Sequence, residues 1–169
     1  MLFLVFSCSQ EPEEIDKVPS LSFLGFKGDS AVNAKYSYRD SNGLNIEVKD
    51  TLILRFEFRD GDGNLGHKDN DTISNWVYIP NSQGSFDTLR GSIFLRDSRT
   101  DFLTAYSFPN IENGNNNSLT GEIEITIDHL FCSAFASDTE RLYYSAYLMD
   151  RDSQVSDVIN TDTFLIICN

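Results

Sequence analysis

The chain has few basic side chains. Its 169 residues include 13 lysines and arginines against 26 aspartates and glutamates, which gives a formal net charge of −13. Such a surface repels nucleic acid and the anionic face of a lipid bilayer, so the sequence excludes both as electrostatic partners. Long hydrophobic runs are also absent. The apolar run at residues 2–6 is far shorter than the about 20 residues that a membrane-spanning helix requires.

Residues that carry common catalytic chemistry are scarce. The chain has two histidines and three cysteines, with no C-x-x-C pair and no Cys/His cluster. The sequence therefore gives no support for a zinc site or a thioredoxin-type redox site. The G-x-S-x-G, H-E-x-x-H and P-loop motifs do not occur. We interpret His67 as a solvated residue of an acidic loop and His129 as a structural residue at a strand end. Only carboxylate-based hydrolysis stays open, because acidic residues are plentiful.

Apolar residues are nevertheless abundant enough for a core. Hydrophobic residues make up 40% of the chain and include 13 Phe and 7 Tyr. This composition argues against global disorder. The length suits one domain and is short for two.

The apolar residues alternate with polar ones, which is typical of half-buried β-strands. The pattern is clearest at residues 51–59, 122–128 and 142–148, with weaker strand signals at 21–26, 32–38, 44–48, 76–79, 92–95, 104–108 and 163–168. Turn-forming stretches rich in Gly and Asn separate these segments. No segment shows a helical stripe, and at most one helical turn fits within residues 133–141. The pattern predicts an all-β, antiparallel sandwich.

The order of these strands resembles that of an immunoglobulin-like domain. Strands B, C, E, F and G would be residues 51–59, about 75–80, 120–129, 142–150 and 158–168. Trp76 on strand C and a tyrosine early in strand F agree with this resemblance. The usual cysteine pair between strands B and F is missing, and Leu54 or Phe56 and Ala146 occupy that layer. We therefore predict one immunoglobulin-like β-sandwich over residues 19–169.

The N-terminal residues resemble the end of a bacterial lipoprotein signal peptide. An apolar run is followed by Ser7, Cys8 and the polar, acidic residues 9–18. The resemblance implies that residues 1–8 are a signal-peptide remnant, that Cys8 takes a lipid, and that residues 9–18 are a tether. It also implies a location at the outer membrane or cell surface. A signal peptide has a basic segment before the apolar run, so its true start would lie upstream of Met1 or the numbering begins inside it. The alternative is a short hydrophobic tail with a chance cysteine.

Two internal segments resemble those of Bacteroidetes-type surface lipoproteins. One, at residues 51–66, is a strand followed by the turn D-G-D-G-N-L-G. The other, at residues 143–168, is a final hairpin with the pattern Y-x-x-Y-x-x-D-R-x-x-x-x-S at residues 144–156. Because members of that group mostly lack a defined activity, this resemblance implies location and fold more than chemistry.

The turn at residues 60–66 also resembles half of a calcium-binding loop. Asp60, Asp62 and Asn64 present oxygen atoms at alternate positions, and the glycines between them permit tight curvature. This spacing matches the first half of an EF-hand loop. The second half departs from it, because Leu65 stands where that loop has Gly and Asp71 stands where it has Glu.

Topology adds two more candidate ligands. In an immunoglobulin-like sandwich the loops after strands B and F lie at the same end, so Asp150 and Asp152 are expected beside the first three residues. We predict a Ca²⁺ site made by Asp60, Asp62, Asn64, Asp150 and Asp152. Arg151 and Lys68 could instead partly neutralise the carboxylates. The alternative is a glycine-rich hairpin with solvated aspartates.

If Cys8 carries a lipid, Cys132 and Cys168 remain as a candidate disulfide of an exported protein. In the expected topology both lie at the end opposite the aspartates. The alternative is a pair of buried, reduced thiols.

Two classes of function follow from these features. The first is a non-catalytic lipoprotein domain at the cell surface, with a structural, adhesion or glycan-binding role. Its partners would be the membrane, through the lipid, and a surface glycan or protein. The second is a metal-assisted hydrolase that uses the aspartates, which requires a deep cleft beside them. Candidate contacts for a binding module are the tyrosines at Tyr36, Tyr38, Tyr78, Tyr106 and Tyr143.

Overall fold

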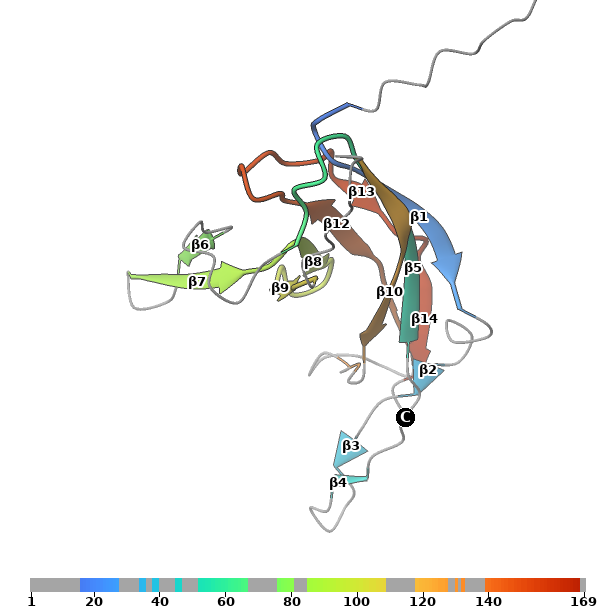
Figure 1. Ribbon diagram of the computed structural model, residues 1–169. Coiled ribbons are helices and arrows are strands. Elements are labelled where there is room, and N and C mark those ends of the chain that lie inside the picture. Colours follow the sequence, from blue (N-terminus) through green and yellow to red (C-terminus); the bar gives the residue numbers. More distant parts are fainter. Residues whose placement is uncertain are drawn as a thin grey trace, which may run out of the picture.

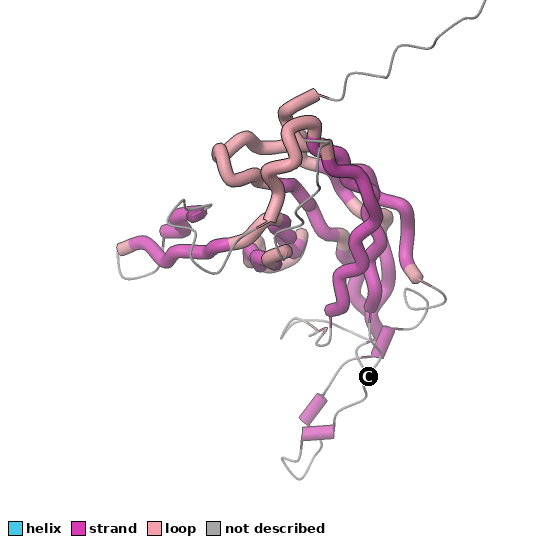
Figure 2. Tube along the Cα trace, in the orientation of Figure 1, coloured by secondary structure: helices cyan, strands magenta, loops and turns pink. Residues whose placement is uncertain are grey.

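The fold is all-β, as the sequence predicts. The computed structural model describes residues 16–27, 34–35, 38–39, 45–46, 52–66, 76–80, 85–108, 118–127, 130, 132 and 139–167. Every regular element within these ranges is a β-strand (Figure 2). Accordingly, this part of the chain contains no helix of the length and apolar character needed to cross a bilayer. Residues 139–142 form a strand, so the single helical turn that the sequence allows within residues 133–141 does not include residues 139–141.

One sheet is built around a long central strand. It contains β1 (Ser20–Phe26), β5 (Leu52–Asp60) and β10 (Leu119–Ile127), in the order β1-β5-β10, and both pairings are antiparallel. Side chains of β5 alternate strictly between buried and less buried positions, as the period-two pattern predicts. The register pairs Asp60 with Leu119 and Leu52 with Ile127. The two ends of this sheet are therefore well defined.

A second sheet lies beside the first in Figure 1. It has antiparallel neighbours throughout, and its members in spatial order are β13 (Ile159–Asn160), β12 (Tyr144–Leu148), β8 (Ile93–Asp97) and β9 (Leu103–Tyr106). A further sheet contains β11 (Thr139–Leu142), which directly precedes β12 in the chain, and β14 (Phe164–Ile167), which directly follows β13. There, β11 pairs with β14, which also pairs in parallel with β2 (Ala34–Lys35).

Two short hairpins complete the described strands. One joins β3 (Tyr38–Arg39) to β4 (Asn45–Ile46), and the other joins β6 (Trp76–Pro80) to β7 (Phe86–Arg90). Both extend away from the main sheets in Figure 1.

The assignment of strand C to residues 75–80 is wrong. The strand that pairs with β12 is β8, whereas β6 pairs only with β7 among the described strands. The physical reason is burial. Ile93 and Leu95 are almost fully buried and supply the inward face that a central strand needs. The turn-forming sequence at residues 81–84 instead favours a local hairpin between residues 76–80 and 86–90.

The described residues share one hydrophobic core, to which β1, β5, β8, β10, β11, β12 and β14 contribute. The residues that the sequence placed in the layer of the missing disulfide, Leu54, Phe56 and Ala146, are all 0% exposed. Aromatic contacts extend the core along its length. The rings of Phe26 and Phe164 lie 5.5 Å apart between centroids. Hydrophobic packing therefore fills the layer that Leu54, Phe56 and Ala146 form.

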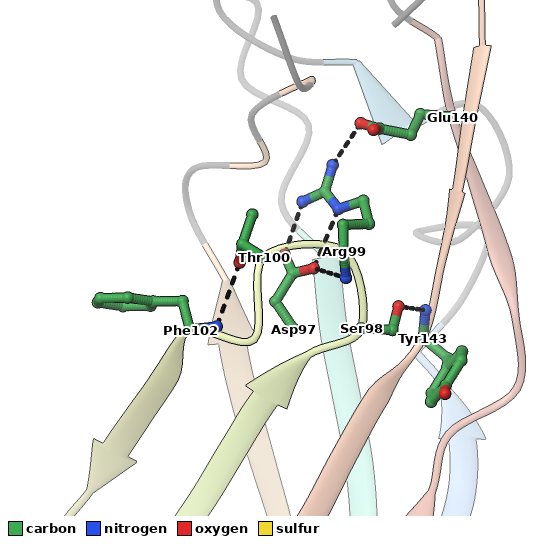
Figure 3. Close-up of polar contacts among 7 residues, drawn as sticks. All are labelled: Asp97, Ser98, Arg99, Thr100, Phe102, Glu140 and Tyr143. Carbon is green, nitrogen blue, oxygen red and sulfur yellow. Dashed lines mark hydrogen bonds and ion pairs between the residues drawn. The ribbon is translucent and has the colours of Figure 1, made fainter. Parts of the chain in front are cut away.

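Two largely buried ion pairs that share Arg99 hold the β8–β9 turn against β11 (Figure 3). Arg99 Nη2 lies 2.6 Å from Asp97 Oδ2, and its Nη1 lies 2.7 Å from Glu140 Oε2. All three side chains are at most 16% exposed. Ser98 Oγ in the same turn accepts a hydrogen bond from the Tyr143 N–H, 3.0 Å long. The turn and the start of β12 are therefore joined by charged and neutral hydrogen bonds.

We predict that Arg99→Met lowers the free energy of unfolding by about 3–5 kcal/mol, because it removes the guanidinium that offsets the charges of two largely buried carboxylates, Asp97 and Glu140. The matched control is Arg55→Met. Arg55 also forms a 2.7 Å ion pair, with Glu122, but the two side chains are 38% and 58% exposed. This control should cost at most about 1 kcal/mol. Urea unfolding measures both values, and equal losses would contradict the assigned role of burial.

Candidate functional site

The loops that follow β5 and β12 meet at one end of the molecule. Arg151 Nε donates to the Asn64 carbonyl oxygen at 2.9 Å, and Asn64 Nδ2 donates to Asp152 Oδ2 at 2.9 Å. Figure 1 shows both loops together at the top of the view. We call residues 60–66 and 150–156 the aspartate pole. The expectation that these two loops share one end is confirmed.

Asp60 lies inside the protein at the end of β5. Its side chain is 0% exposed, and Oδ2 accepts a 3.0 Å hydrogen bond from the N–H of Leu65. The Leu65 side chain is itself buried in the hydrophobic core. This explains why a leucine stands where an EF-hand loop has glycine, because the side chain anchors the loop. The curvature comes from Gly63 and Gly66 instead, whose φ values are 68° and 90°.

Asp150 occupies the corresponding place after β12. It is also 0% exposed. Oδ1 accepts from the Gln154 N–H at 2.7 Å, and Oδ2 accepts from Gln154 Nε2 at 3.1 Å. Asp150 therefore shapes its own loop. Asp152 is exposed and reaches across to Asn64.

The pKa values of the two buried carboxyl groups are displaced upward. Burial, followed by the neighbouring carboxylate of Asp62, raises the pKa of Asp60 to about 6. Burial also raises the pKa of Asp150, against the opposing effect of its hydrogen bond from the Gln154 backbone. Both carboxyl groups are held in an environment that disfavours their negative charge.

Three oxygen atoms at the aspartate pole lack hydrogen-bond donors. Asp60 Oδ1, Asp62 Oδ1 and Asn64 Oδ1 are each buried, and no described residue donates to any of them. These are the three residues whose alternate spacing resembles a calcium-binding loop. Unsatisfied buried acceptors are rare in native proteins and each requires a physical explanation.

All the candidate metal ligands at the aspartate pole are oxygen atoms. No three His, Cys, Asp or Glu side chains in the described part of the chain are grouped as a metal site. The unpartnered oxygen atoms of the pole belong to two carboxylates and to the Asn64 amide. Lys68, Asp71 and both histidines lie outside the described residues.

The aspartate pole also receives the N-terminal segment. The Gly61 N–H donates to the Asp16 carbonyl oxygen at 2.9 Å, and Asp16 Oδ1 accepts from the Val18 N–H at 3.1 Å. The chain thus enters the domain beside Asp60. Residues 1–15, which include Cys8, lie outside the described residues.

The candidate aromatic contacts differ in exposure. Tyr78 on β6 is 66% exposed and Tyr143 is 38% exposed. Tyr106 is partly buried and packs against the core, so less of its ring is exposed for contact with a ligand. Tyr36 and the side chain of Tyr38 lie outside the described residues. Phe102, which the sequence did not single out, is 68% exposed at the start of β9.

The sequence analysis did not predict the hydrogen bonds that Leu65 and Gln154 donate at the aspartate pole, and it did not predict that Asp60 and Asp150 are buried. The strand pattern does contain information on this burial. Asp60 is the next inward position after Phe58, and Asp150 is the next inward position after Leu148. The alternation that predicts the core also predicts that these two carboxylates are buried.

Comparisons with protein-family models, with curated proteins and with solved structures gave no match to this chain.

The raised pKa of Asp60 predicts a pH-dependent loss of stability in calcium-free buffer. A carboxyl group that binds its proton more tightly in the folded state stabilises that state at low pH. We expect its contribution to fall by about 2–3 kcal/mol as pH rises from about 4 to above 6.

The measurement is the difference in free energy of unfolding between wild type and Asp60→Asn across this pH range. Asparagine at this position cannot ionise, so the difference reports the Asp60 carboxyl group together with its interaction with Asp62. A difference that stays constant with pH would contradict the displaced pKa.

Proposed function

We propose that this chain is a non-catalytic, immunoglobulin-like domain of a surface lipoprotein, held at the outer membrane by a lipid on Cys8. The observation that carries this proposal is the order of the N-terminal residues: an apolar run, Ser7, Cys8 and an acidic stretch, followed by a β-domain whose first strand begins at Ser20. The resemblance of residues 60–66 and 144–156 to Bacteroidetes-type surface lipoproteins supports the same location.

The strand order supports an immunoglobulin-like arrangement. The sheet β1-β5-β10 corresponds to strands A, B and E, and β13-β12-β8 corresponds to G, F and C. Tyr144 stands two residues before Ala146, in the place that a conserved tyrosine takes before the second cysteine of antibody domains. The chain departs from the constant-type pattern because β9 extends the second sheet beside β8.

The burial of the aspartates supports a non-catalytic role. Asp60 and Asp150 are 0% exposed, so a substrate cannot reach their carboxylates without a rearrangement of both loops. The pole also lies where the tether enters the domain, through the contact between Asp16 and Gly61. A hydrolase needs reactive groups that open into a cleft. The arrangement therefore favours a structural role for the pole.

Binding to a surface glycan or protein would use the surfaces away from the tether. The β6–β7 hairpin extends from the main sheets in Figure 1 and carries Tyr78, one of the most exposed large side chains described. Exposed aromatic side chains combine a large apolar area with few rotatable bonds, which suits recognition surfaces. We assign the proposed adhesion or glycan contact to this hairpin.

The lipid anchor is tested in native cells. We expect wild-type protein in the outer-membrane fraction, with a lipid-modified N-terminal peptide that starts at Cys8 in mass spectra. Cys8→Ala should release the domain from that fraction, because the chain then lacks an attachment point. The neighbouring change Ser9→Ala should have no such effect. An unmodified peptide that contains residues 1–8 in the wild-type protein would contradict the proposal.

We also propose a disulfide between Cys132 and Cys168, as expected for an exported domain. Cys132 packs against the core, after the end of β10 at which Ile127 pairs with Leu52. This is the end opposite Asp60. Cys168 directly follows β14 and lies outside the described residues.

The bond would close a loop of about 35 residues and stabilise the fold by roughly 3–4 kcal/mol. Thiol labelling of the unfolded, unreduced protein should modify neither cysteine. Labelling of both positions under these conditions would refute the bond.

A further inference from the structure

We infer that the aspartate pole binds one Ca²⁺ ion, with Asp60, Asp62 and Asn64 as its first ligands and the loop after β12 as its second side. This inference does not depend on the lipid anchor. It begins from the three buried oxygen atoms that receive no hydrogen bond from any described residue: Asp60 Oδ1, Asp62 Oδ1 and Asn64 Oδ1.

The Asp60 carboxylate is 0% exposed. Its Oδ2 accepts from the Leu65 N–H, and the Asp62 backbone also stabilises the charged carboxylate, but no described group donates a hydrogen bond to Oδ1. A buried carboxylate oxygen without a donor, a cation or water is costly. The nearby Asp62 carboxylate increases this cost. A cation between the two would replace repulsion with attraction.

Asn64 and the loop after β12 supply the polar groups that face Asp60 and Asp62. Asn64 is held with its Nδ2 directed to Asp152, which leaves Oδ1 as the acceptor without a donor. Both oxygens of Asp150 accept from Gln154, but a carboxylate oxygen has a second lone pair for a metal. No three carboxylates are grouped as a metal site in the described part of the chain, so Asp150 and Asp152 would contribute through bound water or after the loop following β12 moves toward the ion.

The chemistry of this set selects calcium among common divalent ions. All candidate ligands are oxygens, which excludes a preference for zinc. Ca²⁺ accepts 6–8 oxygen ligands at about 2.3–2.6 Å in flexible geometry, and a glycine-rich loop with carboxylates, an amide and water can supply them. Mg²⁺ requires stricter octahedral geometry near 2.0–2.1 Å and gives up its water reluctantly.

The ion would have a mechanical role. It would join the loop after β5 to the loop after β12, and the first of these holds Asp16 through Gly61. Calcium would therefore fix the junction between the N-terminal segment and the domain as well as the end of the core.

Calorimetric titration of the full chain with CaCl₂ tests the inference, together with melting curves in calcium, in magnesium and in chelator. We expect one bound ion per chain. At a calcium concentration a hundredfold above Kd, the folding equilibrium constant should rise about a hundredfold. Magnesium at the same concentration should give a much smaller shift.

Three variants locate the ion. Asp62→Asn and Asn64→Ala should each raise Kd about tenfold or more, because each removes or weakens one ligand. Asn64→Ala leaves the net charge unchanged, so it separates coordination from general attraction to an acidic surface. The control Asp101→Asn removes one charge at an exposed position that pairs with Arg96 and should leave Kd unchanged.

The inference is overturned by folded wild-type protein that shows no calcium-dependent shift, by an equal response to magnesium, or by a shift that survives both Asp62→Asn and Asn64→Ala. Circular dichroism of each variant confirms that it is folded before titration. These results bear on the metal alone, because the location of the lipid is measured separately in cells.

Discussion

The burial of two carboxylates at the ends of two core strands is the constraint on which the rest of the structure depends. Asp60 continues the inward face of β5, and Asp150 continues the inward face of the β12 strand, so both are 0% exposed. Burying such groups costs several kcal/mol unless donors or cations compensate. The two loops are arranged to provide that compensation. Leu65 folds back to donate to Asp60, and Gln154 donates twice to Asp150.

The charge cluster at the β8–β9 turn shows how this fold pairs carboxylates with a cation of its own. Arg99 contacts both Asp97 and Glu140 at 2.6–2.7 Å, so two largely buried carboxylates share one guanidinium within the chain. At the aspartate pole the corresponding balance is incomplete, because Asp60 Oδ1 receives no donor from the described residues. This unpartnered oxygen is the basis for the proposed ion.

Much of the fold could be predicted from the sequence because burial follows strand periodicity. The alternations at residues 52–58 and 142–148 predicted the buried faces of β5 and β12. The same alternation, extended to the next inward-facing residue of each strand, would have predicted the burial of Asp60 and Asp150. Which strands pair with one another was harder to predict from the sequence. The hairpin β6–β7 is a local pairing with a weak pattern, and its Trp76 made it resemble a core strand. The roles of Leu65 and Gln154 were also inaccessible, because they depend on loop hydrogen bonds that no spacing rule describes.

The most direct test of this account is a crystal structure of the full chain grown with calcium. The account predicts an ion at the aspartate pole, with oxygens of Asp60, Asp62 and Asn64 at about 2.3–2.6 Å and anomalous scattering that identifies calcium. A well-ordered pole without an ion, in which a water or a protein donor satisfies Asp60 Oδ1, would contradict it. The pole would then be a hydrogen-bonded turn whose buried charge is balanced without a metal.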